Sequence, residues 1–292
     1  MAKTVLGIVG GSGVYDIAGL ENAHWETVKS PWGEPSDQLL FGTLSGVDMV
    51  FLPRHGRGHV QTPTSINYRA NIDALKRAGV TDIISVSACG SFKEELSPGT
   101  FVIVDQLIDR SFAREKSFFG PGFVAHVSMA HPVCPKLAKA CAEACEEAKI
   151  PFANGGTYLV MEGPQFSTLA ESNLYRSWGC SVIGMTASPE AKLAREAEMP
   201  YALVGMVTDY DCWHEEHDHV TVDQVVKVLM ANADNARNLV KAVAPKLGPD
   251  RTPSPLGIET VLDTALITAP EKRDPQLFRK LDAVAGRVLR KD

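Results

Sequence analysis

This sequence has few cysteines, no long hydrophobic run and no excess of basic residues. Six cysteines among 292 residues are too sparse for a disulfide framework. The apolar stretch after Lys3 is interrupted by glycine within a few residues, too early for a signal-peptide core or a membrane span. The formal charge is −6, and no basic stripe is present to follow a phosphate backbone. We therefore expect a cytoplasmic protein that binds neither membranes nor nucleic acid.

Two further absences concern metal and redox chemistry. The histidines of the segment 214–219 lie three and two residues apart, not the four that places two metal ligands on one helical face, and a solvated loop is favoured over a metal site. Cys134, Cys141 and Cys145 fit one face of a helix as small buried residues, with a redox pair as the alternative. We expect no metal.

What the chain does have is an alternation of short apolar runs and helical patterns. Runs rich in β-branched residues predict strands at 5–9, 49–52, 83–86, 101–104, 158–161, 182–185 and 201–207. Helices are expected at 65–78, 135–148, 167–178, 189–198 and 221–243. This order predicts an α/β fold, and the length fits one large domain.

Prolines and glycines cluster near the end of the chain. They mark a boundary between a domain over 1–247 and a C-terminal extension over 248–292, in which a last helix is expected near 275–289. A lid, a subunit contact and ordinary packing all stay open for this extension.

Carboxylates follow the last apolar run, at Asp209 and Asp211. Open α/β sheets bind ligands beyond the carboxyl ends of their strands. Carboxyl groups shielded from water there can hold a proton or hydrogen-bond a heterocycle. Aspartates also end strands merely as turn formers, so the pair gains its weight from neighbouring motifs.

The turn Gly11-Ser12-Gly13 follows the first run. Its N–H groups and the Ser12 hydroxyl can form an anion nest. Asp16 stands where a dinucleotide fingerprint needs its third glycine, and no Lys-Ser or Lys-Thr follows to make a phosphate-binding loop. A single phosphate, or no ligand, stays open.

Further donors end the other runs. Arg54 and His55 follow the second run, and a guanidinium can grip phosphate through two parallel hydrogen bonds. Ser87 and Thr186 each stand one step past a strand and add hydroxyl donors. Either hydroxyl alone fits a turn or a helix cap equally well.

Several motifs occur in order between about residues 5 and 245: Gly10-Gly11-Ser12-Gly13, Arg54-His55-Gly56, Asn67-Tyr68-Arg69-Ala70-Asn71, Ala88-Cys89-Gly90-Ser91, Glu162-Gly163-Pro164-Gln165-Phe166-Ser167 and Thr208-Asp209-Tyr210-Asp211-Cys212-Trp213. Together they resemble the methylthioadenosine-cleaving members of the trimeric purine nucleoside phosphorylase family. The resemblance implies a single domain with a central mixed, mostly parallel twisted sheet flanked by helices. It also implies reversible phosphorolysis of 5′-methylthioadenosine to adenine and 5-methylthioribose 1-phosphate, phosphate as co-substrate, no metal or organic cofactor, and a homotrimer.

The resemblance also implies a role for each matching residue. The phosphate site is implied at Ser12, Arg54, His55, Ser87, Ala88 and Thr186, the ribose contact at Met185, and the purine site at Asp209, Tyr210, Asp211 and Phe166, with both aspartates catalytic. Specificity is implied at Ser167, Val222, Val225 and Val226, and His126 resembles a residue that the neighbouring subunit lends. Ser12 and Ser87 stand where animal enzymes carry threonine, and both keep the hydroxyl.

The chemistry fits these roles. Breaking a ribosyl C–N bond builds positive charge on the sugar and negative charge on the purine. Bound phosphate would stabilise and then trap the sugar. A protonated Asp209 could donate towards N7 while Asp211 accepts from the 6-amino group, although the sequence leaves open which aspartate does which. A valine pocket would favour a thioether over a hydroxyl at the 5′ position.

Three alternatives remain. A phosphorylase of 6-oxopurine nucleosides, such as methylthioinosine or inosine, would be better served by Asn than by Asp at position 209. The first strand and glycine turn suggest a nucleotide-dependent dehydrogenase. A non-catalytic nucleoside-binding module would bind methylthioadenosine without releasing adenine.

Overall fold

The structure is a computed structural model that describes residues 3–11, 13–214 and 222–290. Its strands are β1 (Val5–Gly10), β2 (Glu21–Glu26), β3 (Leu39–Leu44), β4 (Val47–Pro53), β5 (Asp82–Ser91), β6 (Phe101–Val104), β7 (Gln106–Asp109), β8 (Phe152–Asn154), β9 (Thr157–Val160), β10 (Val182–Gly184) and β11 (Tyr201–Asp209). Its helices are α1 (Tyr68–Arg77), α2 (Pro135–Glu147), α3 (Leu169–Ser177), α4 (Ala187–Glu196), α5 (Val222–Leu247), α6 (Pro275–Lys280) and α7 (Gly286–Leu289), with 3-10 turns at Ile258–Asp263 and Pro270–Lys272.

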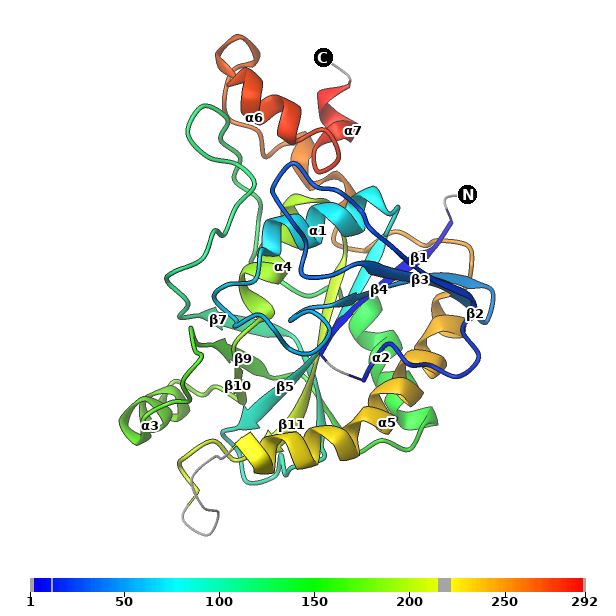
Figure 1. Ribbon diagram of the computed structural model, residues 1–292. Helices are drawn as coiled ribbons and strands as arrows, with labels where there is room; N and C mark the ends of the chain where they lie inside the picture. Colours follow the sequence, from blue (N-terminus) through cyan, green and yellow to red (C-terminus); the bar gives the residue numbers. More distant parts are fainter. Residues whose placement is uncertain (1–2, 12, 215–221, 291–292) are drawn as a thin grey trace.

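One mixed sheet runs through the molecule (Figure 1), in the order β2-β3-β4-β1-β5-β10-β9-β7. Strand β11 pairs with β5 and continues through β6 to β8. Strands β4, β1, β5 and β11 are mutually parallel along their pairings, whereas β10 runs antiparallel to β5. The carboxyl ends of the parallel set therefore lie at one edge of the sheet, which confirms the expected single-domain, mostly parallel architecture.

Every strand expected from an apolar run is present. Strands β2, β3, β7 and β8 were not anticipated. Strands β7 and β8 are short, and β2 carries too many polar residues for the apolar pattern. For β2, nearly every residue is exposed, and it is held by antiparallel pairing with β3. Edge strands of this kind depend on a neighbour rather than on burial, and local sequence does not report that neighbour.

The helix boundaries follow from local caps. Helix α1 begins at Tyr68 rather than at the expected residue 65, because the Asn67 side chain caps it by accepting from the Ala70 N–H. Helix α3 begins at Leu169 behind a capping box formed by Thr168 and Glu171.

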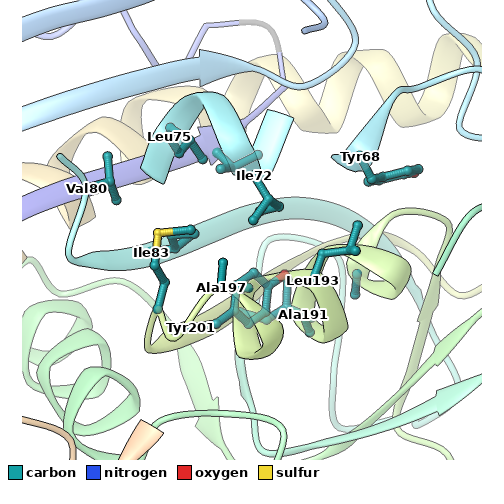
Figure 2. Close-up of a cluster of buried hydrophobic side chains, with 14 of the residues drawn as sticks. Tyr68, Ile72, Leu75, Val80, Ile83, Ala191, Leu193, Ala197 and Tyr201 are labelled. Atoms are coloured by element: carbon teal, nitrogen blue, oxygen red, sulfur yellow. The ribbon is translucent and has the colours of Figure 1, made fainter. Parts of the chain in front are cut away.

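The core lies on both faces of the sheet. Ile83 belongs to the cluster that includes α1 and α4, and its neighbour Ile84 to the cluster that includes α2 and α5, as expected for side chains that alternate along a strand. Figure 2 shows part of the first cluster, to which Ile72 of α1 and Leu193 of α4 both belong.

Cys141 and Cys145 of α2 are buried in the second cluster with free thiols, as expected for small core residues. No group of metal-ligating side chains occurs within the described ranges, which omit His217 and His219. Nor is any helix there long and apolar enough to cross a membrane.

The segment after residue 247 packs onto the first cluster through Leu262, Leu281 and Val284. Arg287 also pairs with the buried Glu198 at 2.6 Å. The expected last helix is divided into α6 and α7. Ordinary packing thus accounts for part of this segment, and the domain boundary, the lid and the subunit contact stay predictions.

Candidate active site

A cavity of about 980 Å³ opens at the carboxyl ends of β1, β4, β5 and β11. Among its lining residues are Arg54, His55, Ser87, Ala88, Phe166, Met185, Thr186, Asp209, Asp211, Val222 and Val226. These residues come from segments far apart in the sequence, and most were expected to share a site. Another cavity, of about 650 Å³ against α2, contains none of them.

Other expected residues lie outside this lining. Ser12 falls outside the described residues, as does the side chain of Val225.

Tyr210 directs its hydroxyl to the Glu94 carbonyl, 3.2 Å away, and leaves only its backbone between the two aspartates. The Ser167 hydroxyl lies 3.7 Å from the sulfur of Met161, which does line the cavity. His126 is exposed and does not line the cavity of its own chain.

Arg54 is buried, and its guanidinium is bound mainly by the protein. Nε donates to Glu190 at 2.8 Å, and Nη2 donates to Ser85 Oγ at 2.5 Å and to the Val9 carbonyl at 3.2 Å. Burial alone would lower the pKa of Arg54, but the Glu190 carboxylate outweighs it and raises the pKa above its usual value.

This pairing limits how Arg54 can meet a phosphate, and its role in phosphate binding stays a prediction. Because Glu190 occupies the Nε and Nη2 edge, Arg54 cannot use that fork to grip phosphate through two parallel bonds. Nη1 donates to the Val86 carbonyl at 3.3 Å and keeps one N–H without an acceptor among the described residues. Arg54 can therefore offer a phosphate a single hydrogen bond and a buried positive charge.

Hydroxyl groups gather beside Arg54. Ser87 Oγ lies 3.4 Å from Thr186 Oγ1 and 3.4 Å from the Tyr158 hydroxyl. Thr186 precedes α4 but makes no side-chain cap, so its hydroxyl is left for the cavity. A Cβ at Gly184 would lie 1.7 Å from the Tyr158 hydroxyl, so glycine there makes room for this third hydroxyl. The donors form one compact set.

His55, the next residue after Arg54, also lines the cavity. Its Nδ1 is 2.9 Å from the Gln61 carbonyl, and its ring stacks on His59 at 4.2 Å between centroids. Burial, together with the nearby Arg54 charge, lowers the pKa of His55 to about 4. The ring is therefore neutral at physiological pH.

The two aspartates form the opposite end of the cavity. Asp209 Oδ1 accepts from the Asp211 N–H at 2.8 Å, and Oδ2 accepts from Thr208 Oγ1 at 2.7 Å. The pairing of β11 with β5 shifts register between Val207 and Asp209. Such an irregularity changes the direction in which the side chains at the end of the strand point. A Cβ at Gly90 would lie 2.8 Å from Asp209 Oδ1, so glycine is needed opposite.

Burial raises the pKa of both acids. The pKa of Asp211 rises to about 6, with the neighbouring Asp209 charge adding to the effect. That of Asp209 also rises, although hydrogen bonds from Thr208 and Asp211 oppose burial. The pair can therefore hold a proton closer to neutral pH than ordinary carboxyl groups do, as general acid catalysis requires.

Apolar side chains form the remaining rim, including Phe166, Val222, Val226 and Met230. Val222 is 66% exposed and Val226 44% exposed, so this side of the cavity is open in the isolated chain. Val222 and Val226 thus line the cavity as expected side chains of an apolar pocket, and their role in binding a methylthio group stays a prediction.

A buried ion pair supports the cavity wall from behind. Arg114 Nε donates to Glu162 Oε1 at 3.0 Å, and Nη1 donates to the carbonyls of Met185 and Ser188. Glu162 also accepts from the Phe112 N–H at 2.6 Å. This pair fixes the backbone of Met185, the expected ribose contact.

Sequence reasoning missed Glu190, Arg114 and Tyr158. Glu190 is 136 residues from its partner Arg54, and Arg114 is 71 residues from Met185, so no local spacing reports either contact. A signal existed for Tyr158, which belongs to an expected strand directly before a quoted motif.

Comparisons with known proteins agree with this geometry. A family model described as the phosphorylase superfamily matches residues 5–245. The S-methyl-5'-thioadenosine phosphorylase of Rhodospirillum rubrum is 67% identical over 287 residues, covering 98% of each chain. That of Cereibacter sphaeroides is 64% identical over 288 residues, covering 99% of each.

Solved structures are similar as well. A methylthioadenosine phosphorylase from an antarctic soil metagenomic library superimposes with a TM-score of 0.91 at 45% identity, over 96% of this chain and 98% of that one. Methylthioadenosine phosphorylase from Schistosoma mansoni in complex with adenine gives a TM-score of 0.79 at 36% identity, over 84% and 92% of the two chains.

Proposed function

The chain belongs to the phosphorylase superfamily, and we propose from this membership and its cavity that it is an S-methyl-5'-thioadenosine phosphorylase. It cleaves 5′-methylthioadenosine reversibly with phosphate to adenine and 5-methylthioribose 1-phosphate. The observation that carries this function is a single cavity with a buried arginine and hydroxyls at one end and two acids of raised pKa at the other.

Phosphate binds at the Arg54 end. The free N–H of Arg54 and the hydroxyls of Ser87 and Thr186 supply donors, and the buried guanidinium supplies positive charge. An anion held beneath the sugar stabilises the oxocarbenium-like transition state, and its oxygen then forms the new bond to the anomeric carbon. Ser12, Ala88 and His55 complete this proposed site.

Adenine binds at the aspartate end. As the C–N bond breaks, its electron pair moves onto the purine, and a carboxylic acid donates a proton towards N7. We assign this donation to Asp209 and the acceptance of a 6-amino hydrogen bond to Asp211. Phe166 faces the base, Met185 contacts the ribose, and Val222 with Val226 receives the methylthio group, while Ser167 and Val225 tune specificity.

One spectrophotometric assay tests this function. Purified protein is given methylthioadenosine, adenosine, inosine or methylthioinosine, with and without phosphate, and the change in purine absorbance is followed. We expect phosphate-dependent release of adenine, fastest from methylthioadenosine. Preference for the inosine compounds would favour the 6-oxopurine alternative, and binding without release would indicate a non-catalytic module. NAD binding would favour the dehydrogenase.

The remaining parts of the proposal concern assembly and conditions. The protein acts as a homotrimer in the cytoplasm, with His126 of each chain lent to a neighbour, and it needs no metal or organic cofactor. The exposure of His126, away from its own cavity, supports this arrangement. Light scattering should give three times the mass of one chain, and dialysis against a chelator should leave the rate unchanged. A monomer, or loss of activity on dialysis, would contradict these parts alone.

A further inference from the structure

The hydrogen bond at His55 Nδ1 determines what the other ring nitrogen can do. A backbone carbonyl can only accept, so the 2.9 Å contact with Gln61 requires Nδ1 to carry the proton. In a neutral imidazole the second nitrogen, Nε2, then presents a lone pair. His55 lines the cavity, and Nε2 has no hydrogen-bond partner among the described residues.

The surroundings keep the ring in this form. Arg54, next in the chain, opposes a second positive charge, and His59 stacks on the ring with an interplanar angle of 10°. No carboxylate contacts the His55 side chain in the described part of the molecule. An anion entering the cavity therefore meets an acceptor at this position, not a cation.

We propose that His55 accepts a hydrogen bond from a protonated phosphate oxygen and thereby selects hydrogenphosphate over oxyanions that carry no proton. The proposal rests on the proposed function, which places phosphate at this end of the cavity. At neutral pH the phosphate dianion keeps one proton, whereas sulfate keeps none. A fully deprotonated oxyanion would set an oxygen lone pair against the Nε2 lone pair, and this acceptor would be left unsatisfied.

The same contact orients the nucleophile. When the protonated oxygen is held at His55, the ionised oxygens face the Ser87 and Thr186 hydroxyls and the sugar. An ionised oxygen is the one that can attack the anomeric carbon. His55 is thus a specificity-determining and positioning residue for the anion.

Calorimetric titration of the wild-type protein with phosphate, sulfate and fluorophosphate at pH 8 tests the proposal. Fluorophosphate is a matched probe, because it has the charge and shape of hydrogenphosphate but no proton. We expect phosphate to bind at least ~10-fold more tightly than either proton-free dianion. Equal affinities for the three anions would overturn the proposal.

The variant His55→Ala separates this role from a structural one. Loss of the acceptor should weaken phosphate binding while leaving sulfate and fluorophosphate little changed, so that the affinity ratio approaches one. General damage to the site would instead weaken the three anions alike and keep the ratio, which would contradict the proposal. His24→Gln, at an exposed histidine that does not line the cavity, should keep the wild-type ratio.

The role of His55 and the proposed function can fail separately. These titrations need no nucleoside and no turnover. If methylthioadenosine releases adenine in phosphate but the anions bind equally, only the role of His55 is wrong. If no adenine is released and no anion binds, the proposed function is wrong as well.

Discussion

The two ends of the cavity differ in how their polar groups are satisfied. At the proposed phosphate end, Arg54 is held by Glu190, by Ser85 and by backbone carbonyls without any ligand. At the purine end, Asp209 and Asp211 lie together under burial, and neither has a cationic partner among the described residues. Most polar groups of Arg54 are satisfied within the protein, whereas the two aspartates are proposed to gain their partner from the bound base.

This difference predicts which changes affect stability and which affect catalysis. A change at the phosphate end breaks contacts of the free protein, so it should cost folding free energy. Replacing Asp209 or Asp211 at the proposed purine end removes a carboxyl group that is costly to bury. Such a replacement should lower the reaction rate and the substrate specificity without lowering the free energy of unfolding.

The largest effect should follow from Glu190→Ala. Arg54 would keep its charge in the core without a counterion, and we expect a loss of about 3–5 kcal/mol in the free energy of unfolding. Urea denaturation measures it. Glu95→Ala, at an exposed glutamate, should change little. If the two variants have the same free energy of unfolding, the Arg54–Glu190 ion pair does not stabilise this end of the cavity.

Asp209→Asn should affect catalysis more than folding. The amide cannot donate an acidic proton, so kcat/KM for methylthioadenosine should fall ~100-fold. The new amide would suit a 6-oxo group, and preference should shift towards methylthioinosine. The melting temperature should not fall, because a buried carboxyl group is removed. A variant that keeps the original purine ranking would show that this role for Asp209 is wrong.

Glu196 tests whether a buried acid without a counterion costs stability elsewhere in this fold. Burial raises the pKa of Glu196 to about 7, and its only partners in the described residues are Ser117 and the Phe118 N–H. Because this pKa lies above the unfolded value, its stabilising contribution is full below about pH 4.5 and is lost as pH rises through 7.

Relative to the wild type, Glu196→Gln should therefore gain about 2 kcal/mol of stability between pH 5.5 and 8.5. Denaturation at several pH values measures the difference, with Glu95→Gln as the exposed control. A difference that is independent of pH would mean that Glu196 ionises normally.

The smallest effect should come from the rim. Val222→Ser places a hydroxyl where the methylthio group is proposed to lie, and turnover of methylthioadenosine should fall about 5-fold more than that of adenosine. Steady-state kinetics on the two substrates give the ratio. Equal losses would remove Val222 from the specificity pocket.

The two ends also differ in how far the sequence revealed them. Asp209 and Asp211 follow a continuous apolar strand, so both their place at the sheet edge and their chemistry are readable locally. Arg54 was found in the same way, but its partner Glu190 was not, because Glu190 approaches it from another segment. The strands β2 and β7 were missed for the same reason, since pairing partners supply what their own side chains do not.

The sequence by itself determined the α/β order, the strand ends that carry polar groups and the family, because periodicity and short motifs are properties of neighbouring residues. Only the tertiary structure decided which donors remain free for phosphate, which nitrogen of His55 carries the proton and how far the acids resist ionisation. These properties depend on burial and on partners distant in the chain, which are determined only when separate segments pack together.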